Sequence, residues 1–300
     1  DFGDYRSSEA VEVMLCDFGA VTVIYRIPIN GPFEGLLSLS ESLYENERLL
    51  ADSRHRLDQL VRDIRLAIDR PSVSPEVEDY LVFSVEHCSP SAIQALGTPF
   101  EPMFAHVLRS ERTRLSDQEI REATSCRISF SRDDTALIDW NAAIVFGEDM
   151  DDVRAVLEFV NVELLEMRTL DEQLDQALDQ GYVALTRKAR VTSWLPGSHE
   201  AALTQIGQLQ VDSAVLFERV ANTLKLLGDQ YLARVYRLAS QRFHLEAWDA
   251  SIIRKLQTLD SIYGKMSDRA TTQRMEVLEW IIIALITISI AVSFLPMTSH

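Results

Sequence analysis

The C-terminal end of the chain carries an apolar run that constrains the fold more than any other segment. Residues 280–295 contain no charged residue, no glycine and no proline. A helix rises about 1.5 Å per residue, so residues 277–297 would cover roughly 30 Å, the thickness of a hydrocarbon core. A buried core helix is the alternative, but it would need protein on every side, and only five residues follow the run. We therefore expect one C-terminal transmembrane helix over residues 276–297.

The flanks of this run predict how the anchor is oriented. Basic side chains precede it, and only His300 follows it. Positive charge stays on the cytoplasmic side, so most of the chain should face the cytoplasm at a bacterial inner membrane, or the matrix at a mitochondrial inner membrane. The excess of arginine over lysine favours the bacterial source. Trp280 suits the headgroup level, and Glu279 is either an interfacial carboxylate or a polar contact to a neighbouring anchor helix. The expected entry into the bilayer consists of Leu278, Glu279, Trp280, Ile281, Ile282 and Ile283.

Charge and cysteine content exclude several classes of protein. The net charge of the 300 residues is −17, with most of the acidic excess in the first half of the chain. Affinity for nucleic acid comes mainly from neutralising phosphates, so direct binding of nucleic acid is not expected. The three cysteines form no C-x-x-C pair, which indicates a reducing compartment and no disulfide framework.

The first half of the sequence predicts an α+β head over residues 1–148. Apolar, β-branched runs at 11–18 and 21–29 predict a hairpin, and further strands are expected at 80–85, 127–130, 136–140 and 143–146. One apolar stripe predicts a helix over 43–68. Ser116 followed three residues later by Glu119 is a capping-box pattern, which predicts the start of a short helix.

The second half predicts a bundle or stalk of long helices over residues 149–275. Helical periodicity runs over 153–190, with a possible kink at Gly181, and then over about 201–227 and 230–263 around breaks at 193–198 and 228–229. A 4-3-4-3 spacing near the end is typical of a coiled-coil seam, which could pack within the chain or join copies of it. This expected oligomerisation seam consists of Ile252, Leu256, Leu259, Tyr263 and Met266. Gly264 is expected to interrupt the last helix.

The sequence offers little chemistry. Phosphate-binding, dinucleotide-binding, zinc-protease and serine-hydrolase motifs are absent, so we expect no catalytic residue, no cofactor and no metal. The acids at positions 148, 149, 151 and 152 could bind a divalent cation, but acids at a helix start also complement its dipole, and we favour that reading. A basic group should pair with acidic helix faces, or else with an acidic partner or lipid headgroups. Its members are Arg234, Arg237, Arg242, Lys265, Arg269 and Arg274.

Three pieces of the C-terminal half carry a resemblance to a known family. They are the run LTQIGQL at 203–209, the helical stretch through Ala247-Trp248-Asp249, and RMEVLEWIII at 274–283. Together they resemble the YagE-like family, also called "required for meiotic nuclear division" proteins. The resemblance implies an α/β front, long helices and one C-terminal span. It also implies large homo-oligomers, which in mitochondrial relatives hold ribosomes at the inner membrane, and it brings no catalytic residues.

The function expected from the sequence is a membrane-anchored, oligomeric and non-catalytic scaffold. Its partners would be further copies of the chain, the lipid bilayer and a protein that the sequence cannot name. One alternative is a component of a CorA-like ion transport assembly, although the chain lacks the second span and the Gly-Met-Asn loop of such channels. Another alternative is an enzyme with an unrecognised site.

Overall fold

The computed structural model describes residues 5–16, 19–33, 35–68, 72–86, 99–186, 207–211, 214–215, 218 and 229–294. For 184–186, 266–267, 269–274, 276–278 and 288–294 it describes the backbone alone. Most of the helix expected over 201–227 and the break expected at 193–198 therefore lie outside the described residues.

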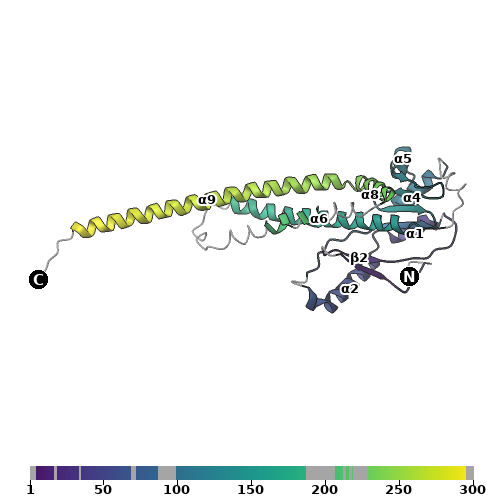
Figure 1. Ribbon diagram of the computed structural model, residues 1–300, viewed down its shortest axis with the longest axis horizontal. Coiled ribbons are helices and arrows are strands. Elements are labelled where there is room, and N and C mark those ends of the chain that lie inside the picture. The colour runs from purple at the N-terminus through teal and green to yellow at the C-terminus, as the bar shows by residue number, and fades with distance from the viewer. Residues whose placement is uncertain are drawn as a thin grey trace. The chain divides into compact units, whose positions relative to one another are not determined.

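The fold combines helices with two separate antiparallel or mixed sheets, so the expectation of an α+β head is confirmed (Figure 1). The strands are β1 (Glu12–Leu15), β2 (Val21–Ile24), β3 (Leu81–Val85), β4 (Arg127–Ile128), β5 (Thr135–Ile138) and β6 (Ala142–Phe146). The helices are α1 (Gly35–Leu43), α2 (Glu47–Asp63), the 3-10 turn η1 (Arg65–Ala67), α4 (Glu101–Arg109), α5 (Asp117–Ser125), α6 (Asp151–Thr186), α8 (Gln230–Arg242) and α9 (Leu245–Phe294).

The larger sheet has the strand order β3-β6-β5-β4 and holds the centre of the head. β3 runs parallel to β6, while β5 is antiparallel to both β6 and β4. Every residue of β5 and β6 is buried. Such short, continuous apolar strands are typical of a sheet covered on both faces.

Helices α1 and α4 pack on this sheet through a shared apolar core. Phe104 of α4 lies between the rings of Phe33 and Phe146, at centroid distances of 5.2 and 5.7 Å. Ser40 is the polar exception in this core, and its hydroxyl donates a 2.7 Å hydrogen bond to the carbonyl of Val107. A buried hydroxyl with a partner avoids the cost of an unsatisfied polar group.

The expected start of the short helix α5 is confirmed. The Ser116 hydroxyl accepts a hydrogen bond from the backbone N–H of Glu119, as a capping box requires. The helix expected over 43–68 is present as α2 but is shorter, because α1 ends at Leu43 and Glu45 adopts a φ of 46°. Asn46 then caps α2 by accepting from two backbone N–H groups, so the chain begins a new helix there.

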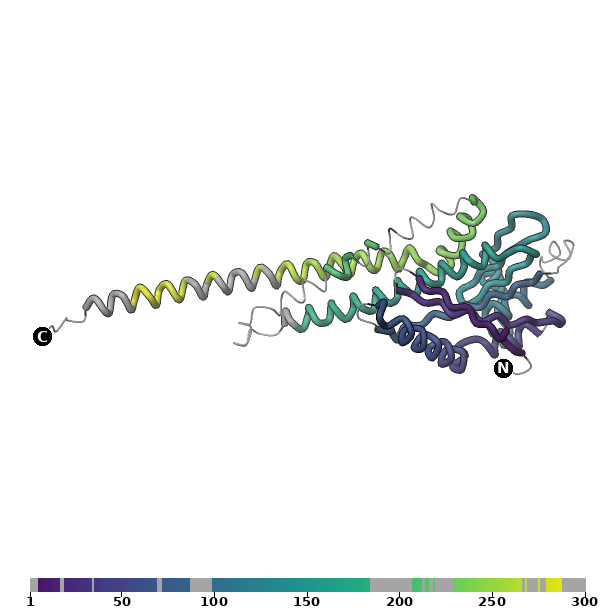
Figure 2. The backbone as a smooth tube through the Cα atoms, turned by 60° about the horizontal axis from the view of Figure 1, so that its bottom comes forward, coloured from purple at the N-terminus to yellow at the C-terminus, as the bar shows by residue number. Residues whose placement is uncertain are grey.

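The β1–β2 hairpin forms a sheet of its own (Figure 2) and meets α2 through a polar side-chain contact. The Tyr25 hydroxyl donates a 2.7 Å hydrogen bond to Asp52, which also pairs with Arg56. All four residues of β1 are exposed. The hairpin therefore stays at the surface and adds little to the core of the head.

In the second half of the chain, the breaks between helices differ from those that the sequence predicted. A break at His244, which adopts a φ of 55°, separates α8 from α9. By contrast, α9 continues through Gly264, where an interruption was expected, and α6 continues through Gly181. By compactness, one unit comprises residues 1–169 and 214–250, and a second comprises 170–213 and 251–300.

Within the second unit, α6 and α9 lie side by side. A Cβ added at Gly181 would lie 3.0 Å from the Ile262 side chain, so this glycine permits close packing of α6 against α9. Lys255 of α9 lies 2.8 Å from Asp171 and 2.6 Å from Asp175. Two acids of α6, Asp171 and Asp175, thus pair with a lysine of the same chain.

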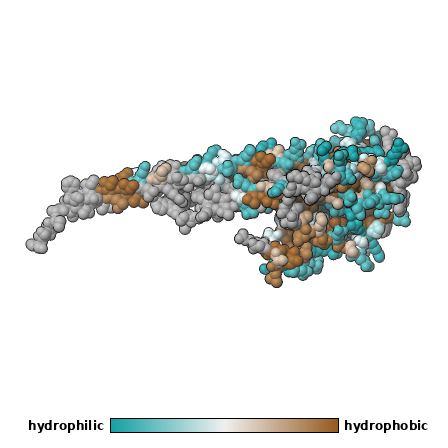
Figure 3. Space-filling model, viewed as in Figure 1, coloured by the Kyte–Doolittle hydropathy of each residue, from teal (hydrophilic) through white to brown (hydrophobic). Residues whose placement is uncertain are grey.

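The expected transmembrane helix over residues 276–297 is wrong: across the described part of the chain, no helix combines the length and the apolar character of a membrane span. The described side chains of α9 from Trp280 to Ile286 are all apolar (the brown stretch on α9 in Figure 3). Upstream of it, α9 is rich in charged residues.

Candidate functional site

The most unusual polar group of the head is a carboxylate in its core, at the turn between β5 and β6. Asp139 follows the last residue of β5 and is fully buried. Its backbone N–H donates to the carbonyl of Ala142, which closes the turn, and its Oδ1 accepts a 2.7 Å hydrogen bond from the N–H of Trp140. A buried charge is costly unless it is paired, so its partners decide what this site can do.

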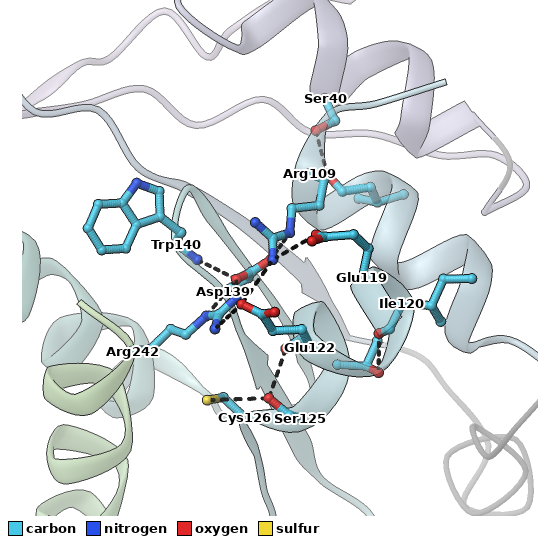
Figure 4. Close-up of polar contacts among 12 residues, drawn as sticks. Ser40, Arg109, Glu119, Ile120, Glu122, Ser125, Cys126, Asp139, Trp140 and Arg242 are labelled. Carbon is cyan, nitrogen blue, oxygen red and sulfur yellow. Dashed lines mark hydrogen bonds and ion pairs between the residues drawn. The ribbon is translucent and has the colours of Figure 1, made fainter. Parts of the chain in front are cut away.

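Two arginines bring positive charge to Asp139, and each is the last residue of a helix (Figure 4). Arg242 of α8 donates from Nε to Oδ1 at 2.7 Å, and its Nη2 contacts the same oxygen. Arg109 of α4 places Nε 2.9 Å from Oδ2, although its N–H does not point at that oxygen. A cation at a helix C-terminus also interacts favourably with the helix dipole.

Acidic residues of α5 form an outer layer around the two arginines. Arg109 Nη2 lies 3.4 Å from Glu119, and Arg242 Nη1 lies 3.6 Å from Glu122. Both glutamates are about half exposed, so solvent screens these pairs. On the opposite side, the Tyr80 hydroxyl donates a 3.0 Å hydrogen bond to the backbone carbonyl of Asp139.

The electrostatics of the site follow from burial and from these cations. Burial raises the pKa of Asp139, while Arg242 and Arg109 act in the opposite direction. Burial alone would lower the pKa of Arg242, but the carboxylate of Asp139 outweighs that effect and raises it. Burial raises the pKa of Tyr80 well above its usual range, so this hydroxyl keeps its proton.

This arrangement can hold helices in place. No part of Asp139 is exposed. Its contacts join the last residues of α4 and α8 to the β5–β6 turn. We call Asp139, Arg109 and Arg242 the arginine clamp.

The clamp contains one of the site residues expected from the sequence. Arg242 pairs with acids of its own chain, whereas Arg237 and Lys265 are exposed and Arg234 lies over the ring of Tyr231. The side chains of Arg269 and Arg274 lie outside the described residues. Of the described residues, no group of three or more His, Cys, Asp or Glu could hold a metal ion.

Part of the expected oligomerisation seam is already buried within a single chain. Ile252, Leu259 and Tyr263 are buried in the isolated chain, and Leu256 is half-buried. The side chains of Met266 and Leu278 lie outside the described residues. The rest of the expected membrane entry, from Glu279 to Ile283, is exposed.

Asp139 and Arg109 were not predicted as site residues, although the sequence around Asp139 carries a signal. Asp139 is a single acid between two apolar strand runs. An acid in such a position is either at a turn or paired in the core, and here it is both. Nothing in the spacing of Arg109 or Arg242 pointed to a shared partner.

Fold and clamp together define an α+β head, built on a four-stranded mixed sheet to which internal ion pairs fasten α4 and α8. A protein-family model described as "Uncharacterized protein MJ0711, N-terminal domain" matches residues 1–152 of this chain. The chain belongs to this family. The expected membership of the YagE-like family is therefore wrong. That expectation used short pieces of the helical half, whereas the family match covers the head.

A curated relative supports the same assignment. The chain is 24% identical over 186 residues to the "Uncharacterized protein MJ0711" of Methanocaldococcus jannaschii. The match covers 61% of this chain and 56% of that protein, so the chain spans little more than half of its relative. No solved structure matches the chain.

Proposed function

We propose that this protein is a non-catalytic scaffold that self-associates through α9 and presents its head to a protein partner. The observation that carries the proposal is a run of exposed apolar side chains on α9. Their exposed fractions range from 48% to 71%. They are Trp280, Ile281, Ile282, Ile283, Leu285 and Ile286.

The arrangement of these side chains favours association between several helices. Successive residues of a helix are turned by about 100°, so six apolar residues among seven leave no polar face. A contiguous exposed apolar surface of this kind is typical of an interaction site. Helices gathered around one axis bury the side that faces the axis and the sides that face their neighbours, so three or more identical copies would cover more of this surface than two.

The rest of the described chain is consistent with a structural role for the head. The charged groups of the clamp pair with one another and hold helices α4 and α8 on the sheet. Ile252, Leu259 and Tyr263 are already covered within one chain. The self-association is therefore assigned to the segment from Trp280 to Ile286.

The test is the mass of the full chain in solution, measured by light scattering over a dilution series. A defined oligomer is expected for the wild-type protein, and Ile282→Lys should lower the mass to that of the monomer. Ile253→Lys is the matched control, because Ile253 is on the same helix and is 45% exposed, against 54% for Ile282. A monomeric wild-type chain would overturn the proposal, and so would equal effects of the two substitutions.

A further inference from the structure

A second buried acid lies on α6, away from the arginine clamp. Glu163 is only 4% exposed, and the Tyr236 hydroxyl of α8 donates a 2.8 Å hydrogen bond to its Oε2. Tyr236 is itself buried, and its ring packs near Phe159 of α6 at a centroid distance of 6.2 Å. The hydrogen bond thus joins α6 to α8 in an apolar setting.

The charged group that α9 brings to Glu163 is another acid. Asp249 acts on Glu163 through its charge, and its Oδ1 is buried with no hydrogen-bond donor among the described residues. Glu246, on the same helix, adds further negative charge to Asp249. In the described part of the chain, no arginine or lysine bears on the charge of Glu163 as Arg242 does on that of Asp139.

These surroundings favour the neutral form of Glu163. Burial raises the pKa of Glu163 to about 7, the hydrogen bond from Tyr236 opposes this, and Asp249 adds to it. Burial also raises the pKa of Asp249. Burial raises the pKa of Tyr236 above its usual range, so Tyr236 remains the donor in its bond to Glu163.

We propose that Glu163, Tyr236 and Asp249 form a proton-dependent joint, which holds α8 against α6 while Glu163 is protonated and loosens when Glu163 is ionised. The physical reason is the shortage of donors. An ionised carboxylate can accept about four hydrogen bonds, and here one donor and a neighbouring acid face it. Opening the joint admits water to the carboxylate and separates it from Asp249. The joint is independent of self-association through α9.

The test is hydrogen–deuterium exchange of the α8 amides in the full-length protein, compared with the Glu163→Gln variant at pH 6 and pH 8. Glutamine keeps the acceptor for Tyr236 but does not titrate in this range. Comparing the two proteins at one pH cancels the intrinsic pH dependence of exchange. With a pKa of about 7 in the closed joint, the wild-type to variant ratio of α8 exchange should rise about tenfold from pH 6 to pH 8.

Two further variants make the test specific. Glu172→Gln changes an exposed glutamate of the same helix and should leave the pH dependence of wild type intact. Asp249→Asn removes the neighbouring charge, so the rise in exchange should move to lower pH. A wild-type to Glu163→Gln ratio that is equal at both pH values would overturn the proposal. An equal rise in the amides of β5 and β6 would also overturn it, because that result would indicate global unfolding.

Discussion

Asp139 and Glu163 are both buried acids, but the groups around them differ in sign. Two arginines lie within hydrogen-bond or ion-pair distance of Asp139, whereas a tyrosine and a second acid face Glu163. Burial raises the pKa of each acid; cations oppose that shift at Asp139, and an acid reinforces it at Glu163. Solvent exclusion alone therefore does not decide whether a buried carboxyl group carries a charge.

The comparison assigns different tasks to the two sites. In the clamp, two arginines oppose the effect of burial on the pKa of Asp139, so we expect it to fasten α4 and α8 to the sheet over a wide pH range. In the joint, the pKa of Glu163 is about 7, so its protonation changes near neutral pH. The same fold thus contains one helix contact that resists changes of pH and one that responds to them.

The largest effect is expected from removing the charge of the clamp. Asp139→Asn leaves two guanidinium groups facing a neutral amide, and breaking a buried ion pair in this way costs roughly 3–5 kcal/mol of the free energy of unfolding. Urea denaturation at pH 7 measures this loss. Asp133→Asn, at an exposed acid of a nearby turn, is the control and should change stability by less than about 0.5 kcal/mol.

A double substitution checks that the loss at Asp139 comes from the unpaired charge. Arg242→Met should be less costly in the Asp139→Asn background than in the wild-type protein, because the pair is already broken there. Additive losses would mean that the two residues act separately. In that case, charge pairing at Asp139 would not explain the difference between the clamp and the joint.

The second effect concerns the pH dependence of stability. The pKa of Glu163 is about 7 in the folded chain against 4.5 for the free side chain, so the folded state binds more protons between these values. Stability from this group is therefore fully present below about pH 4.5 and is lost as the pH rises through 7. The shift corresponds to a loss of about 3 kcal/mol.

Urea denaturation of wild type and Glu163→Gln at several pH values between 5 and 8 isolates that contribution. The difference between the two proteins should change by about 2–3 kcal/mol across this range, with the variant relatively more stable at pH 8. A constant difference would show that Glu163 is ionised throughout this range.

The smallest effect is expected at the rim of the clamp. Glu122 lies 3.6 Å from Arg242 and 4.0 Å from Arg109, but its side chain is half exposed. Exposed ion pairs contribute about 0–1 kcal/mol, so Glu122→Gln should lower stability by no more than that, and less at high salt. A loss as large as that of Asp139→Asn would place Glu122 inside the clamp.

Local sequence patterns predicted much of the head. The strand runs became β3, β5 and β6, the Ser116 cap begins α5, and the long periodic stretch became α6. These features depend on neighbours within a few residues, which a single sequence displays. The break at His244 was missed because its cause, a positive φ at a residue other than glycine, has no clear signature in the residue types around it.

The clamp and the joint could not be predicted, because they depend on contacts between distant segments. Asp139 meets Arg242 across a sequence separation of 103, and Glu163 meets Tyr236 across 73. Periodicity shows which face of a helix is apolar, but not which charged residue a buried acid will meet. The C-terminal run illustrates the same limit, since a stretch of apolar residues was taken for a membrane span that the described helices do not contain.

The parallel pairing of β3 with β6 has a consequence for the order in which the head folds. Leu81 pairs with Ala142, so β3 is made long before its partner, while β5 and β6 are neighbours joined by the tight turn at Asp139. Closing the short β5–β6 loop loses less conformational entropy than closing the long loop between β3 and β6. During synthesis, β3 must therefore wait with an unpaired edge until the β5–β6 hairpin has emerged, and an unpaired edge strand is open to misassociation.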